Sequence, residues 1–409
     1  MARERGQTPC MRRRHVLAGV LTAAVMVGCS GGSSNSRGAG SAAHGTTTRP
    51  TTVQPSTTQP TTTAPTGTPA PTACAVGPQH LPDTIDANFA TALAFAPDGR
   101  LFYAERGGTV RVVQDGESRV FATVATVTSE PDGGYSERGL LGLAVSPTFA
   151  TDHYVYAFYS KANRTQQEII RWTDCAGVAN DPTPLIEFPA GSDCCHKGGR
   201  LAFGPDGKLY VTLGELHASA AAQDTDNVRG KVLRYNPDGS VPGDNPFGTD
   251  DPVWAFGFRN PFGIAFSPTG QLAITNNGPT GDAGAPSTGY DTLVIDVERG
   301  GGYQWPNCYG YSHLLGTATS CGDGQIAPDW SSENTTVVPT GATFVDNAGP
   351  AAYAGHLVFC TFNRGMLIVT PGSPHADVSP GPSQCRLDVK QGPDHALYYS
   401  DTEHIYRAA

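Results

Sequence analysis

The sequence predicts an all-β fold, a six-bladed β-propeller, for residues 74–409 of the chain. Fifty glycines and 33 prolines supply the backbone angles that many tight turns require. Only 16% of the residues are charged, and the patterns of long amphipathic helices are scarce. A strand–turn–strand pattern also recurs through this region, which is typical of a repeat architecture.

Each repeat joins two apolar strands through a turn of the Pro-Asp-Gly type. The two clearest copies agree at nearly every position, and the full set covers 93–103, 143–147, 201–211, 264–272, 391–399 and a degenerate copy at 341–369. The intervals leave room for about four short strands per repeat, so six copies predict six blades. A single blade cannot bury both faces of its sheet, so closure of the ring supplies the core and leaves a site at one end of the channel. The competing architecture is a pair of β-sandwiches.

Residues 1–29 have the pattern of an export signal. Basic residues at 12–14 precede an apolar run, 16–27, that is too short to span a bilayer as a helix. Small residues then precede Cys29, as at the cleavage site of a lipoprotein, so we expect Cys29 to carry lipid and to hold the protein at the outer face of the cell membrane. The paired arginines leave both the twin-arginine and the Sec export routes open, and Met11 is an alternative start.

Residues 30–73 are predicted to form a disordered linker. The segment is rich in Gly and Ser and then in Thr and Pro, with almost no apolar side chain to bury. Such a chain stays extended and solvated, and its threonines are candidates for glycosylation. The linker would therefore tether the predicted propeller to the membrane.

Eight of the ten cysteines lie in the predicted propeller, and an even number in an exported chain predicts disulfides. The preferred pairs join cysteines that are near in sequence: Cys308 with Cys321 and Cys360 with Cys385. The adjacent Cys194 and Cys195 are predicted to pair with other cysteines rather than with each other. The complete connectivity stays open.

The charge of the chain excludes one class of partner. The formal net charge is −10 at pH 7, which disfavours nucleic acids and anionic membrane surfaces. We therefore expect no nucleic-acid partner and a contact with the membrane only through the lipid. A neutral or small partner fits this charge better.

One long motif and several short motifs follow each other in a fixed order. The long motif runs from His196 to Glu215, and the short ones occupy 222–224, 230–234, 236–240, 244–247, 257–261 and 302–306. In this order they resemble the glucose/sorbosone dehydrogenase family of soluble quinoprotein sugar dehydrogenases, over nearly all of the chain after Cys74. The upstream segment 137–143 resembles the variant shared with propellers related to hedgehog-interacting protein.

The resemblance implies that a sugar hydroxyl is oxidised, with hydride transfer to pyrroloquinoline quinone (PQQ) at the top of the propeller. His196 matches the family's general base, and Glu215 matches a carboxylate that orients this histidine. Arg259 matches the arginine that lies against the quinone and its oxyanion. Asn260 and Asn277 are the implied polar contacts of the cofactor.

The resemblance also implies a calcium ion. Gly278 and Pro279 match positions whose backbone carbonyls hold a calcium ion (Ca²⁺) that polarises the quinone. Carbonyl oxygens are hard ligands of the kind that calcium prefers. Removal of calcium would then abolish activity.

The sequence departs from the well-characterised branch of the family where that branch binds the cofactor's carboxylates. Asn363 replaces a lysine, Leu387 replaces an arginine, and Phe262 replaces a glutamine. Arg364 and Arg386 are the candidate replacements, because each lies beside a lost basic position.

Two functions of different classes remain. The first is a sugar (aldose) dehydrogenase that passes electrons to a membrane or soluble acceptor, and the second is a non-catalytic propeller that binds a glycan or a protein. The presence of His196, Glu215 and Arg259 favours the enzyme, whereas the lost basic contacts favour the binding protein. The enzyme requires these three residues to converge on one mouth of the channel.

Overall fold

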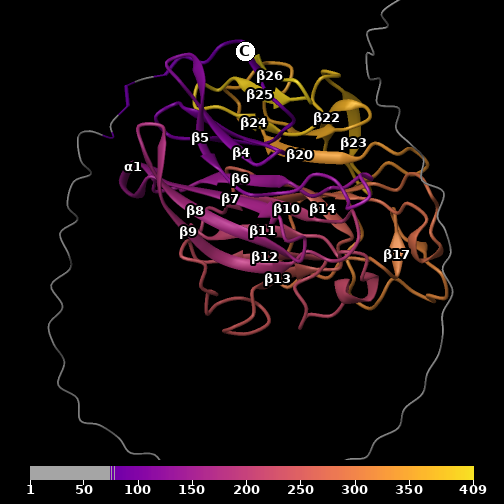
Figure 1. The fold of residues 1–409 in the computed structure, drawn as a ribbon. Helices are drawn as coiled ribbons and strands as arrows, with labels where there is room; N and C mark the ends of the chain where they lie inside the picture. Colours follow the sequence, from indigo (N-terminus) through magenta and orange to yellow (C-terminus); the bar gives the residue numbers. More distant parts are fainter. Residues whose placement is uncertain (1–73, 75, 78) are drawn as a thin grey trace, which may run out of the picture. The chain divides into compact units, whose positions relative to one another are not determined.

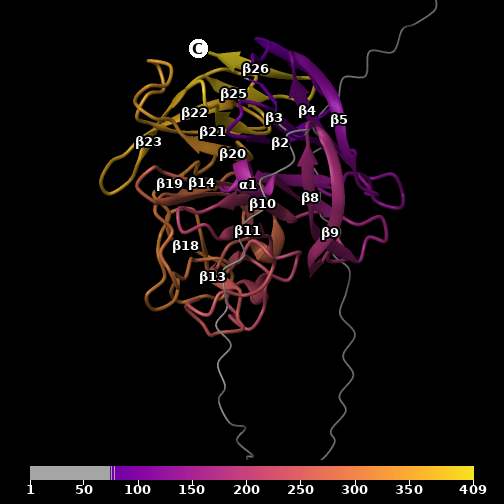
Figure 2. The same cartoon turned by 90° about the vertical axis from the view of Figure 1, so that its left-hand side faces the viewer.

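A computed structural model describes residues 74, 76–77 and 79–409. In these residues, six sheets of four antiparallel strands form the blades of a propeller, as the repeats predict (Figure 1, Figure 2). The predicted signal 1–29 with Cys29 and the predicted linker 30–73 lie outside the described residues. Within the described part of the chain, no helix is long and apolar enough to cross a membrane.

The first three blades follow each other along the chain. The first contains β2 (Ala90–Phe95), β3 (Leu101–Glu105), β4 (Thr109–Gln114) and β5 (Glu117–Thr123). The second contains β6 (Leu140–Val145), β7 (Tyr154–Ser160), β8 (Gln166–Cys175) and β9 (Val178–Pro189), with the short helix α1 (Phe149–Asp152) between β6 and β7. The third contains β10 (Gly198–Phe203), β11 (Leu209–Leu213), β12 (Lys231–Tyr235) and β13 (Val253–Phe256), with the 3₁₀ turn η2 (Ser219–Ala222).

The fourth blade carries an inserted hairpin, and the sixth closes the ring. The fourth contains β14 (Asn260–Phe266), β15 (Leu272–Asn277), β16 (Thr292–Val294) and β19 (Trp330–Ser331), with the 3₁₀ turn η3 (Asp282–Gly284) and the hairpin β17 (Cys308–Tyr309) and β18 (His313–Leu314). The fifth contains β20 (Pro339–Phe344), β21 (Leu357–Thr361), β22 (Gly365–Thr370) and β23 (Asp377–Pro380). The sixth contains β24 (Val389–Gln391), β25 (Leu397–Ser400), β26 (His404–Ala408) and the early strand β1 (Thr84–Asp86).

The predicted turns join the first two strands of the blades. The turn at 97–99 connects β2 to β3, the turn at 205–207 connects β10 to β11, and the degenerate copy is the fifth blade. Closure of the ring depends on β1, which pairs with the last strand β26 through Ile85 and Ile405. The first and last described strands therefore hold one blade together.

The innermost strands β2, β6, β10, β14, β20 and β24 each pack against the next around the channel. Hydrogen bonds join the start of one inner strand to the start of its neighbour. Thr91 Oγ1 donates to Leu140 O at 2.7 Å, the Gly198 amide donates to Asn260 Oδ1 at 3.1 Å, and Thr340 Oγ1 donates to Arg386 O at 3.0 Å. The residues that precede the inner strands are thus gathered at one mouth of the channel.

A buried cation crosses the channel below this mouth. Arg200, on β10, forms an ion pair of 2.7 Å with Asp388 and donates to the carbonyl oxygens of Thr91 and Leu141. Its guanidinium carbon also lies 5.5 Å from the centre of the Phe262 ring. Because the pair is nine-tenths buried or more and has further hydrogen bonds, Arg200 ties blades together, and Phe262 packs against it.

The disulfides confirm two predicted pairs and correct a third prediction. The four bonds are Cys74–Cys175, Cys194–Cys195, Cys308–Cys321 and Cys360–Cys385. The prediction that Cys194 and Cys195 pair elsewhere is wrong. The other six cysteines of the described region bond among themselves, and the two adjacent Cα atoms are only 3.7 Å apart, so each sulfur reaches the other.

Candidate active site

His196 and Glu215 meet because they lie at the same end of a hairpin. His196 comes just before β10, Glu215 comes just after β11, and these two strands are antiparallel. His196 Nδ1 forms a hydrogen bond with Glu215 Oε1. The histidine is 3% exposed and the glutamate is fully buried, so the pair that the sequence predicts exists at the mouth of the channel.

The surroundings favour a neutral histidine. Burial lowers the pKa of His196, and the positive charge of Arg259 lowers it further. Burial also raises the pKa of Glu215, although Arg259 opposes this shift. A neutral His196 that donates a hydrogen bond from Nδ1–H to Glu215 has an unprotonated Nε2. This nitrogen makes no hydrogen bond within the described residues and is not completely buried, so a substrate proton can reach it.

Arg259 precedes β14 and lies beside this pair, since the Glu215 amide donates to Arg259 O at 2.8 Å. Its guanidinium binds both oxygens of Asp282 at 2.7 Å and lies 5.6 Å from the ring centre of Trp305. Burial opposes ionisation of Asp282, but the Arg259 charge holds the pKa of that carboxyl well below its usual range. The sequence prediction missed Asp282; a carboxylate in the turn after Gly278 was the available signal.

Asn260 and Asn277 lie next to each other at the same mouth of the channel. Asn260 Nδ2 donates to Asn277 Oδ1 at 3.2 Å and to Glu137 Oε2 at 3.1 Å. Glu137 also accepts a hydrogen bond from the Lys197 amide at 3.2 Å. Glu137 stands at the head of one of the recognised motifs, but the sequence prediction gave it no role.

The predicted calcium ligands adjoin Arg259. The Gly278 carbonyl accepts a hydrogen bond of 2.5 Å from Arg259 Nη1, and the Gly278 amide donates to Asp291 at 2.8 Å. Gly278 and Pro279 line a pocket together with Trp305. A guanidinium therefore already provides the positive charge at this carbonyl, and Asp282 is paired with that guanidinium. This arrangement does not fit calcium, and calcium binding stays a prediction.

Arg364 and Arg386 lie at the same mouth, in the fifth blade and just before the sixth. Arg364 is exposed in the turn between β21 and β22, and this turn adjoins the start of β20 through the pair Pro339 and Thr361. Arg386 precedes β24, is half-buried, and donates to Phe362 O at 2.9 Å. Among the hydrogen bonds of the described residues, none joins either arginine to His196 or Arg259.

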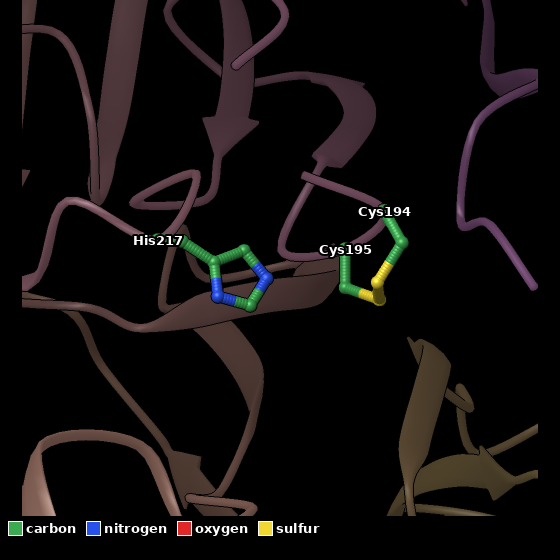
Figure 3. A group of neighbouring side chains, drawn as sticks. All are labelled: Cys194, Cys195 and His217. Carbon is green, nitrogen blue, oxygen red and sulfur yellow. A yellow bond between two sulfur atoms is a disulfide. The ribbon is translucent and has the colours of Figure 1, made fainter. Parts of the chain in front are cut away.

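A second histidine, His217, lies against the predicted base, and the sequence prediction missed it. His217 stacks on His196 with 4.0 Å between ring centres and 12° between ring planes. A ring nitrogen of His217 and the sulfur atoms of Cys194 and Cys195 lie within 4.8 Å of one another (Figure 3). The two sulfurs are bonded to each other, so they are not available as thiolate ligands for a metal. The signal in the sequence was the position of His217, two residues after Glu215.

The fold and the site define a six-bladed propeller with a buried histidine, glutamate and arginine at one mouth of its channel. Residues 88–405 match the family model described as glucose/sorbosone dehydrogenase. The chain therefore belongs to the glucose/sorbosone dehydrogenase family, as the motifs predict.

Similar proteins are sugar dehydrogenases. Quinoprotein glucose dehydrogenase B of Acinetobacter calcoaceticus is 32% identical over 262 residues, which cover 56% of this chain and 52% of that protein. Aldose sugar dehydrogenase YliI of Escherichia coli K12 is 32% identical over 228 residues, 53% of this chain and 58% of that protein. The chain thus spans about half the length of these curated relatives. The PQQ-bound aldose sugar dehydrogenase of Streptomyces coelicolor shares the fold, with a TM-score of 0.63, 24% identity and coverage of 78% and 93%.

Proposed function

We propose that this protein is a sugar (aldose) dehydrogenase that oxidises a sugar hydroxyl and transfers the hydride to PQQ, with His196 as the general base. The observation that carries the proposal is the buried pair of His196 and Glu215 at the channel mouth, which leaves His196 Nε2 without a hydrogen bond among the described residues. The names of the relatives support an oxidoreductase that acts on sugars.

The pair of His196 and Glu215 suits removal of a hydroxyl proton. Because burial and Arg259 lower the pKa of His196, the imidazole is neutral at physiological pH and can accept a proton at Nε2. The resulting imidazolium keeps its Nδ1 proton and donates it in a hydrogen bond to Glu215, whose carboxylate stabilises the positive charge and fixes the plane of the ring. Loss of this proton makes the same carbon a hydride donor. PQQ, when bound, supplies a two-electron acceptor for that hydride.

The donor set at the mouth fits an anionic cofactor. PQQ carries three carboxylates, and guanidinium groups bind carboxylates through two parallel hydrogen bonds. Arg364 and Arg386 would meet these carboxylates. Arg259, whose guanidinium is already paired with Asp282, would line the site beside them with Asn260 and Asn277.

A titration followed by absorbance tests the proposal. The purified protein would be titrated with PQQ, with and without added calcium, and then mixed with a panel of aldoses. We expect saturable binding and sugar-dependent reduction of the bound quinone. Absence of binding at micromolar PQQ would contradict the proposed cofactor and leave a propeller that binds a glycan or protein. A dependence on added calcium would restore the predicted metal site.

We also propose that lipid on Cys29 holds the domain at the outer face of the cell membrane, where the sugar is outside the cell and an acceptor lies in or near the membrane. The four disulfides support an oxidising compartment. We expect labelled fatty acid to be incorporated into the wild-type protein but not into a Cys29→Ala variant. Equal labelling of the two proteins would contradict the anchor.

A further inference from the structure

The Cys194–Cys195 disulfide and the ring of His217 form one surface beside the proposed base, which we call the disulfide–histidine wall. The sulfurs and a His217 ring nitrogen lie within 4.8 Å of one another, and Figure 3 shows the imidazole extending toward the two cysteines. The same imidazole stacks on His196 at 4.0 Å. The proposed proton transfer uses no atom of this wall.

The wall is held rigidly. The buried ammonium of Lys197 and the buried guanidinium of Arg138 donate to carbonyl oxygens of the preceding loop, 190–193, at 2.6 to 3.1 Å. The Cys194 carbonyl accepts a hydrogen bond of 2.9 Å from the Glu137 amide. A bond between adjacent cysteines also closes a small ring and leaves the two side chains little rotational freedom. Binding to such a surface loses little conformational entropy.

The wall is more exposed than the base. His196 is 3% exposed, whereas His217 is exposed and the two cysteines are half-buried. Because His217 covers a face of His196, a molecule whose hydroxyl reaches Nε2 must lie beside the wall. The face of an imidazole and the sulfurs of a disulfide are polarisable surfaces with little hydrogen-bonding capacity, so they favour the apolar part of a ligand.

We propose that the disulfide–histidine wall is the part of the sugar-binding site that packs against the C–H face of the sugar ring, and that it sets the affinity for the sugar. This inference rests on the proposed function. A sugar ring presents hydroxyls at its edge and C–H groups on its faces, so burial of one face against the wall leaves a hydroxyl directed to His196. His196 then acts on the proton, and His217 and the disulfide position the ring.

Two substitutions of His217 test the contact in the full-length protein, with D-glucose as the sugar. His217→Ala should raise KM about three- to tenfold and lower kcat by a smaller factor, because most of the lost stacking acts equally in the ground and transition states. His217→Phe keeps a flat ring and should restore KM. An unchanged KM in His217→Ala would overturn the proposal, as would a Phe variant that is as impaired as the Ala variant.

The disulfide is tested by the double variant Cys194→Ala/Cys195→Ala, which should raise KM in the same direction. The matched control is Cys74→Ala/Cys175→Ala, which removes a disulfide at the start of the described chain and should leave KM unchanged. The exposed His395, in the turn between β24 and β25, provides a histidine control through His395→Ala. An equal rise of KM in the two double variants would contradict a specific role of the wall.

Calorimetric titration of glucose into the wild-type protein and into His217→Ala separates this inference from the proposed function. If the wild-type protein binds glucose without oxidising it, and His217→Ala binds glucose more weakly, the wall is supported and the dehydrogenase is refuted. Normal oxidation with equal glucose affinity in both proteins would refute the wall alone. No glucose binding to the wild-type protein would overturn the wall.

Discussion

The two sides of the channel mouth differ in how completely their polar groups are paired. On the side of the third and fourth blades, three buried side chains have polar partners: His196 is bonded to Glu215, and Arg259 is bonded to Asp282. On the side of the fifth and sixth blades, Arg364 is exposed, and the side chain of Arg386 makes one hydrogen bond among the described residues, to a carbonyl. The contrast separates proton transfer, which the first side would perform, from cofactor affinity, which the second side would set.

The largest effect is expected from His196→Ala. Loss of a general base lowers turnover by about two to four orders of magnitude. We expect cooperative thermal unfolding to remain, which would show that the variant is folded. Steady-state rates with saturating PQQ and sugar would measure the loss. Turnover near that of the wild type would show that His196 is not the base, and proton transfer could then not be assigned to the side of the third and fourth blades.

A smaller loss of turnover, of about a hundredfold, is expected from Glu215→Gln, because an amide holds the ring less well and does not stabilise the imidazolium.

The pH dependence of kcat/KM in the wild type tests the protonation state of His196. The neutral form of His196 is the active form, so activity falls as the pH falls through its folded pKa. Because burial lowers this pKa, the acidic limb of kcat/KM in the wild type should lie below the ordinary histidine value of about 6.5.

The control for this substitution is the position of the acidic limb. Glu215→Gln removes the negative charge that favours the protonated histidine, so the limb should move to lower pH in the variant. A limb that moves to higher pH would show that another group titrates. An acidic limb above 7 in the wild type would contradict the neutral histidine.

On the second side, Arg386→Ala should weaken PQQ binding about tenfold, since one charge-assisted hydrogen bond is lost from a partly solvated position. The rate at saturating PQQ should stay near that of the wild type. Fluorescence or calorimetric titration would give the Kd. Arg119→Ala, on the exposed outer strand β5, is the matched control and should leave Kd unchanged. Equal affinities in all three proteins would place the cofactor's carboxylates away from Arg386.

The sequence predicted the blades because their signals are local. The turn at 205–207 fixes a hairpin by its own backbone preferences, and that hairpin brings His196 to Glu215. Closure by β1 was not predictable, because a three-residue strand carries no repeat signature. The pairing of Arg259 with Asp282 depends on how a loop folds back. The Cys194–Cys195 bond depends on which partners the other cysteines take.

The smallest effect tests the second side by repair. Asn363 is exposed, and its hydrogen bond to Thr336 O is long, at 3.4 Å, so a lysine fits here without burying a charge. Leu387, in contrast, is 4% exposed, and an arginine at this position would be forced into the core. Asn363→Lys should therefore tighten PQQ binding by up to about tenfold, less in high salt because the site is solvated. Asn363→Gln is the control of similar length without charge. If the lysine and glutamine variants bind PQQ equally, the thin basic set of the second side does not limit cofactor affinity, and the contrast between the two sides loses its meaning for function.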